Sequence, residues 1–120
     1  MDETIQPVLE ASGGPPVLVL DGELDLARAP SLQRAIDQLR ADGHSTIVVD
    51  LLGVNFLDST ALGVLVAALA RCREAGGDLH LIVAEPRILK VLEITGLAGT
   101  FPLHPTRTGT LFLAGEANGQ

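Results

Sequence analysis

The sequence predicts an α/β fold built on a largely parallel sheet. Two continuous apolar runs, at 46–51 and 79–84, are typical of strands buried on both faces. Segments with helical spacing alternate with these runs, and such alternation favours right-handed crossovers between parallel strands. Because 120 residues are long enough for one core, we expect a single domain over 1–120. Its core should span about 4–104, and the tail at 105–120 has no clear structural prediction.

The N-terminal part is expected to form an antiparallel hairpin and then a helix. Strand-like stretches at 4–9 and 17–20 are separated by a Gly-Gly-Pro-Pro turn. A helix is predicted over 25–41, with Gly43 as its stop. Pro30 must lie in its first turn, because an interior proline removes a backbone hydrogen bond. The apolar positions of this helix are Leu26, Leu32, Ala35, Ile36 and Leu39.

The second half of the chain continues the alternation. A helix over 59–75 follows the first buried strand and ends at a Gly-Gly pair. A further helix at 86–94 begins with a proline and is closed by a glycine. A short strand at 101–104 completes the predicted sheet.

The helix over 59–75 has two contrasting faces. The arc expected to pack on the sheet consists of Leu62, Leu65, Val66, Leu69 and Cys72. Leu65 and Leu69 should share one core with Val48 and Ile82. The opposite arc begins with small apolar residues, which are Gly63, Val64 and Ala67. This arc is either a docking surface, since small side chains allow close approach, or a face covered by the tail.

Composition excludes several classes of function. The formal net charge of −7 repels phosphate backbones and anionic lipid, and the absence of Trp and Tyr leaves few base-stacking side chains. We therefore expect neither nucleic acid nor a membrane as a partner. No apolar run reaches the roughly 20 residues that span a bilayer. The acidic N-terminus does not resemble a signal peptide, and the single cysteine cannot form an internal disulfide, so a cytoplasmic location is expected.

No catalytic constellation is evident. His44, His80 and His104 lack the spacing of a metal site, and each is interpreted as solvated or hydrogen-bonded. Ser59 is not part of a G-x-S-x-G elbow, and no phosphate-binding Gly-Lys-Ser/Thr loop is present. We expect no enzymatic activity, no metal and no cofactor. A small hydrolase that uses Ser59 is kept as an alternative, which a panel of ester substrates tests.

The stretch NFLDSTALG, at 55–63, places three polar residues between apolar runs. Side-chain oxygens of Asp, Ser and Thr accept hydrogen bonds from the free N–H groups of a first helical turn, so a helix cap is predicted. Ser59 lies where a strand-to-helix turn presents its side chain outward, within reach of a kinase. A phosphate there adds about −1.5 to −2 charges, which a helix N-terminus accommodates and a dry interface does not.

Four sequence blocks carry a family resemblance: GELD at 22–25, VVDL at 48–51, FLDSTALG at 56–63 and ITGL at 94–97. Together they closely resemble the bacterial anti-sigma factor antagonists, which are small single-domain proteins with the STAS fold. The resemblance covers residues 17–103. It implies a four- to five-stranded mixed sheet with helices packed mainly on one side.

The resemblance also implies a partner and a switch. In that family, the first hydroxyl after the Asp is the serine phosphorylated by the anti-sigma factor, which doubles as a kinase; that position is Ser59. The family Asp of the GELD block lies beside this serine and maps to Asp25. The implied function is to bind the serine-kinase anti-sigma factor and free a sigma factor until Ser59 is phosphorylated, with a separate phosphatase to reset the protein. The expected partner-binding residues are Asp25, Asp58, Thr60, Ala61, Gly63, Val64 and Ala67.

Two features depart from the family pattern. The common Asp-Ser-Ser-Gly has become Asp58-Ser59-Thr60-Ala61, which adds a methyl group at the expected docking edge. The C-terminal segment lacks the amphipathic helix that usually ends the family. The alternative function is a constitutive STAS scaffold or transport-complex subunit without a phosphorylation switch. Incubation with the cognate kinase and ATP distinguishes the two.

Overall fold

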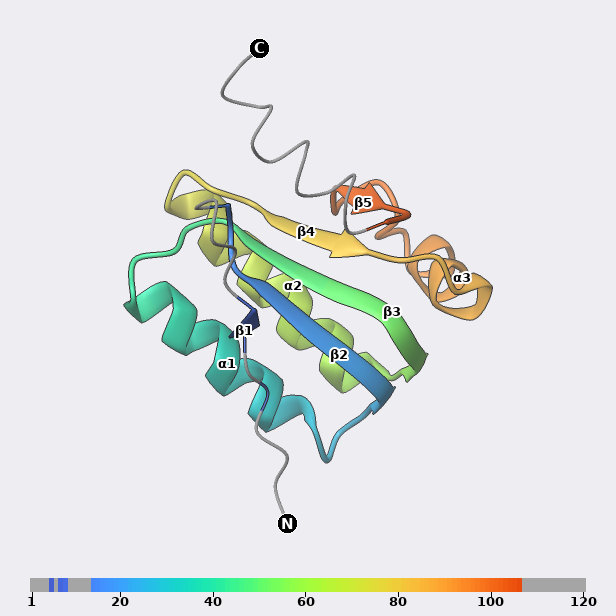
Figure 1. The fold of residues 1–120 in the computed structure, drawn as a ribbon. Helices are drawn as coiled ribbons and strands as arrows, with labels where there is room; N and C mark the ends of the chain where they lie inside the picture. Colours follow the sequence, from blue (N-terminus) through green and yellow to red (C-terminus); the bar gives the residue numbers. More distant parts are fainter. Residues whose placement is uncertain (1–4, 6, 9–13, 107–120) are drawn as a thin grey trace.

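The computed structural model describes residue 5, residues 7–8 and residues 14–106. Half of the strand predicted at 4–9 and most of the tail at 105–120 lie outside the described residues. In chain order the elements are β1 (Pro7–Val8), β2 (Val17–Leu24), α1 (Ala29–Ala41), β3 (Ile47–Leu57), α2 (Ser59–Glu74), β4 (Leu79–Ile82), α3 (Pro86–Ile94) and β5 (Leu103–His104) (Figure 1).

The described strands form one five-stranded sheet in the order β1-β2-β3-β4-β5. β2 to β5 are parallel to one another, as the alternation of strands and helices predicted. The only antiparallel pairing among the described residues is that of the two-residue β1 with β2. The predicted α/β architecture is therefore confirmed, but the sheet is less mixed than expected.

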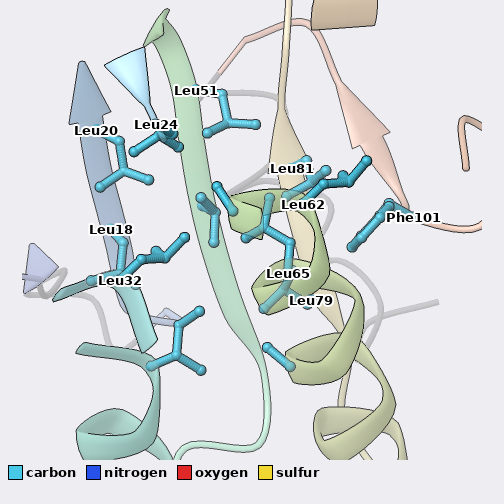
Figure 2. Close-up of a cluster of buried hydrophobic side chains, with 14 of the residues drawn as sticks. Leu18, Leu20, Leu24, Leu32, Leu51, Leu62, Leu65, Leu79, Leu81 and Phe101 are labelled. Carbon is cyan, nitrogen blue, oxygen red and sulfur yellow. The ribbon is translucent and has the colours of Figure 1, made fainter. Parts of the chain in front are cut away.

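The helices pack on one face of this sheet, where they bury the main core (Figures 1 and 2). Figure 2 shows Leu62 and Leu65 of α2 among leucines of β2, β3 and β4. Burying one such side chain stabilises the fold by about 1.5–3 kcal/mol. The helix residues of the core include Leu32, Ile36 and Leu39 of α1, Leu62, Leu65 and Leu69 of α2, and Ile88 and Leu92 of α3.

Val48 and Ile82 do not belong to this core, so the prediction that they share it with Leu65 and Leu69 is wrong. With Val17 they form a second cluster of buried residues. The physical reason is the period of a strand, whose successive side chains point to opposite faces of the sheet. β3 is nevertheless buried on both faces at its start, as predicted, because Val48 and its neighbours are fully buried.

Three boundaries differ from their predicted positions in a way that shapes the site. α1 begins at Ala29 rather than at 25, because the N–H groups of Arg28 and Ala29 donate to the Asp25 carbonyl oxygen at 3.0 and 2.9 Å and form a turn. Pro30 lies in the first helical turn, as predicted. β2 and β3 extend beyond their predicted ends to Leu24 and Leu57. β2 therefore ends directly before the turn at Asp25, and β3 ends directly before the Asp58 cap of α2.

The far end of α2 is held by a close approach of two loops. A Cβ on Gly77 would overlap the carbonyl oxygen of Ser45. Arg73 near the end of α2 donates from Nε to the Asp78 carboxylate at 3.0 Å and from Nη2 to the Thr100 carbonyl oxygen at 2.9 Å. α2 is thus fixed at its C-terminal end by contacts with the loops before β4 and β5.

Candidate functional site

The candidate site lies where β2 and β3 end side by side. Their parallel register pairs Leu24 with Leu57, so Asp25 and Asp58 are the first residues after two neighbouring strands. The Asp58 N–H donates to the Leu24 carbonyl oxygen at 3.0 Å. The Leu26 N–H donates to Asp58 Oδ2 at 2.8 Å. Both chain neighbours of Asp25 are therefore hydrogen-bonded to Asp58.

Asp58 is the N-cap of α2, and the helix cap predicted from the Asp-Ser-Thr sequence is confirmed. Its backbone is extended, and its Oδ1 accepts a hydrogen bond from the Ala61 N–H at 2.9 Å. The Asp58 carbonyl oxygen accepts from the Leu62 N–H at 3.0 Å, which starts the helical pattern. One carboxylate oxygen of Asp58 thus binds the first turn of α2, and the other binds the loop after β2. Asp58 therefore fixes the start of the helix relative to this loop.

Ser59 and Thr60 are the first two residues of α2, and both are exposed. Their hydroxyl groups are accessible to an enzyme that approaches this end of the helix. The first turn of a helix has free N–H groups and a partial positive charge, which favour an anion placed there. The structure therefore allows a phosphate on either hydroxyl without burying it.

The remaining predicted docking residues of α2 differ in exposure. Gly63 is exposed, and Val64 and Ala67 are half-buried. Ala61 is fully buried in the main core, so its predicted place at the docking edge is wrong. Val66, predicted to be in the core, is 37% exposed instead.

One rotation of α2 explains both corrections. The helix turns the side that carries Ala61 and Ala68, together with the leucines, toward the rest of the core. Because α2 is apolar around much of its circumference, the sequence pattern left this rotation open. The exposed residues between Ser59 and Ala70 are Ser59, Thr60, Gly63, Val66 and Ala70.

The turn that follows β2 is held in place on both sides. Asp25 Oδ1 accepts a hydrogen bond from the Arg28 N–H at 3.2 Å, so this half-buried carboxylate faces its own turn. The Arg28 guanidinium donates to the carbonyl oxygens of Asp21 and Glu23, the latter at 3.0 Å. Asp25 thus contributes negative charge to the site while its backbone and side chain shape the turn.

Leu26 is a site residue that the sequence analysis missed. It was assigned to the apolar side of the helix over 25–41, but it precedes α1 and its side chain is 69% exposed. Pro30 carried the signal that could have revealed this, because a proline near the start of a helix leaves the residues several positions before it outside the helix.

His80 and His104 lie away from this site, on β4 and β5. His80 Nδ1 and His104 Nε2 are 3.0 Å apart, and the interpretation of these two histidines as hydrogen-bonded is confirmed. Burial lowers the pKa of both rings, and the neighbouring His104 lowers the pKa of His80 further. In the described part of the chain, no three His, Cys, Asp or Glu side chains gather as metal ligands. None of the helices described there is long and apolar enough to cross a membrane.

Known proteins resemble this chain in sequence and in fold. The STAS domain family matches residues 6–109. The anti-sigma-B factor antagonist of Staphylococcus aureus (strain NCTC 8325 / PS 47) is 37% identical over 76 residues, which cover 63% of this chain and 70% of the relative. The crystal structure of an anti-sigma factor antagonist from Mycobacterium paratuberculosis is 31% identical, with a TM-score of 0.79, and the match covers 95% of this chain and 98% of that one.

A more distant similarity concerns the fold alone. The Bacillus cell fate determinant SpoIIAA in its phosphorylated form is 24% identical, with a TM-score of 0.68 over 87% of this chain and 95% of that one.

Proposed function

Because this chain belongs to the STAS domain family and to its anti-sigma factor antagonists, we propose that it binds a serine-kinase anti-sigma factor and is released when Ser59 is phosphorylated. Binding of the anti-sigma factor frees a sigma factor, and a separate phosphatase restores the binding form. Anti-sigma factor antagonists are non-enzymatic regulators, so ATP and magnesium belong to the kinase.

The observation that carries this proposal is the position of Ser59. It is exposed at the first residue of α2, directly after the Asp58 cap. The same cap is hydrogen-bonded to the loop that contains Asp25. These hydrogen bonds hold the acidic loop next to the residue that precedes Ser59, which supports a single partner contacting both.

The physics of this position favours a reversible switch. A phosphate on Ser59 adds about −1.5 to −2 charges beside free N–H groups at the start of α2, so the folded state tolerates it. A partner surface packed against Ser59 would instead enclose a new charge, which costs several kcal/mol in a dry interface. Since about 1.4 kcal/mol corresponds to a tenfold change in affinity, such a charge is sufficient to end the complex.

The partner surface proposed here follows the exposed groups at this end of the molecule. It comprises the turn with Asp25, the exposed Thr60 and Gly63, and the half-buried Val64 and Ala67. Asp58 contributes mainly by positioning, since both of its carboxylate oxygens accept backbone hydrogen bonds. SpoIIAA, which has the same fold, is known in a phosphorylated form, and this supports a phosphorylated state of this chain.

The test is phosphosite mapping with the purified serine-kinase anti-sigma factor of the source bacterium, ATP and magnesium. Wild type should gain one phosphate on Ser59, and Ser59→Ala should gain none while it still binds the kinase. A phosphate on Thr60 in wild type would move the switch by one residue, and Thr60→Ala is the matched control. Tight binding without phosphate on either residue would favour a constitutive scaffold, and absence of binding would contradict the proposed function.

A further inference from the structure

We propose that Leu26 is the apolar anchor with which this chain contacts its anti-sigma factor, and that it fits a small apolar pocket with basic groups at its rim. This inference rests on the proposed function and names a residue that selects the partner. It concerns the turn between β2 and α1, in which Leu26 lies next to the capping residue of the switch helix.

Leu26 has an exposed side chain and a backbone that is hydrogen-bonded to the cap of α2. It is 69% exposed, although most leucines of the described chain are buried. Its N–H donates to Asp58 Oδ2 at 2.8 Å, and Asp58 immediately precedes Ser59. An exposed aliphatic side chain alone requires no explanation. Here the backbone of the same residue is hydrogen-bonded to Asp58, which directly precedes the proposed phosphorylation site.

The backbone around Leu26 is held in place by hydrogen bonds within its own turn. On one side, the Asp25 carbonyl oxygen accepts hydrogen bonds from the N–H groups of Arg28 and Ala29. On the other, the Arg28 guanidinium donates to the carbonyl oxygens of Asp21 and Glu23. Because this turn is already ordered, binding of the partner costs little conformational entropy in it. More of the free energy gained by burying Leu26 therefore contributes to affinity.

The charge of the segment around Leu26 indicates the chemistry of the partner. Asp21 and Glu23 are exposed, Asp25 is half-buried, and Arg28 is the one basic residue, so the three acidic residues and one Arg of 21–28 leave a net charge of −2. An apolar side chain with acidic neighbours is complementary to an apolar pocket flanked by Arg or Lys side chains. Because Ser59 follows the residue that holds Leu26, a phosphate on Ser59 adds charge close to this apolar contact.

The experiment compares Leu26→Ser with the matched control Leu52→Thr. Leu52 is 43% exposed, and the strand alternation places it with Val48, on the face of the sheet away from the helices. Affinity for the purified serine-kinase anti-sigma factor is measured by calorimetry with ADP in place of ATP, which prevents phosphorylation. Phosphorylation kinetics with ATP provide a second readout, and thermal unfolding shows that each variant is folded.

Leu26→Ser should weaken binding about 10- to 100-fold, as expected when a side chain buried on binding is truncated. It should raise the KM of the kinase for this substrate with little change in kcat, because a uniform binding contact is lost. Leu26→Met should retain wild-type affinity within about threefold, and Leu52→Thr should bind like wild type.

Three results would overturn the inference and can be told apart. If wild type binds and is phosphorylated on Ser59 but Leu26→Ser binds equally tightly, the anchor is wrong and the proposed function stands. If Leu52→Thr weakens binding as much as Leu26→Ser, the effect is not specific to the turn and the anchor is also wrong. If wild type does not bind the kinase at all, the proposed function fails, and the anchor fails with it.

Discussion

One oxygen of the Asp58 carboxylate accepts a hydrogen bond from the N–H group of Leu26, which lies 32 positions earlier in the chain. The other oxygen of Asp58 caps α2. One side chain therefore determines both where the helix begins and where the turn after β2 lies. Any change at Asp58 alters the helix cap and the neighbouring turn together. Any charge added at Ser59 arises beside both.

Asp58→Ala should lower the free energy of unfolding by about 1–3 kcal/mol, because the helix cap and a charged hydrogen bond to the turn are lost together. Ser59→Ala is the matched control. Its exposed hydroxyl is not the cap, so the change should stay within about 0.5 kcal/mol. Equilibrium urea unfolding measures both variants, and equal losses would mean that Asp58 does not carry the cap.

Ser59→Asp should leave the protein folded and weaken kinase binding. A carboxylate at the start of α2 interacts favourably with the free N–H groups, by about 0.3–1 kcal/mol. The loss of affinity should be smaller than that caused by phosphate, since Asp adds one charge and fewer oxygens. Calorimetry and thermal unfolding measure the two effects. Lower stability with unchanged affinity would be the opposite of this prediction.

Leu69→Ala should destabilise the fold by about 2–5 kcal/mol, because it leaves a cavity in the main core. Val66→Ala on the same helix is the control, and its effect should be near zero since Val66 is 37% exposed. Urea unfolding of both variants tests the rotation of α2. Comparable losses at the two positions would show that the helix is turned differently.

Gly77→Ala should destabilise the fold by about 1–3 kcal/mol, because the new methyl group has to displace the Ser45 carbonyl. Gly63→Ala makes the same chemical change in open space on α2, where alanine is the better helix former. It should stabilise the protein by about 0.5–1 kcal/mol. Thermal unfolding of the pair should therefore give shifts of opposite sign.

The His80–His104 pair should make stability depend on pH. Burial holds the pKa of both rings in the folded protein below the usual 6.5. As the pH falls through 6.5, the unfolded chain gains protons that the folded chain does not, so stability is lost in this window and is fully present above it. Urea unfolding at about pH 7.5 and about pH 5.5 measures the loss.

A variant that replaces both histidines with Gln removes these titrations. The stability of His80→Gln/His104→Gln should therefore decrease less over the same interval, even if its stability at the higher pH is lower because the hydrogen bond is altered. A decrease as large as that of wild type would mean that other groups cause the pH dependence.

Local sequence determined the type and order of the helices and strands in the described chain. α3 spans Pro86–Ile94, as predicted, because its proline start and glycine stop act within one turn of the helix ends. α2 begins at Ser59, as predicted, because the Asp cap is adjacent in sequence. The exposed hydroxyl of Ser59 is likewise a property of a strand-to-helix junction.

Tertiary structure alone decided which faces are buried and which residues of the site meet. Periodicity favoured Val66 over Ala61 as a core residue, whereas packing buries Ala61. The hydrogen bond between the Leu26 backbone and Asp58, 32 residues apart in sequence, likewise depends on how the two strands pair.

The register of β2 on β3 decides which residues meet at the candidate site. It shifts between Val19 and Asp21 and again between Gly22 and Glu23, so that Leu24 lies opposite Leu57. No local pattern encodes these shifts, because they depend on how two distant strands and the helices packed on them fit together. The sequence by itself therefore determined that Asp58 caps α2 and that Ser59 begins it, and the packing of the sheet decided that Asp58 is hydrogen-bonded to Leu26.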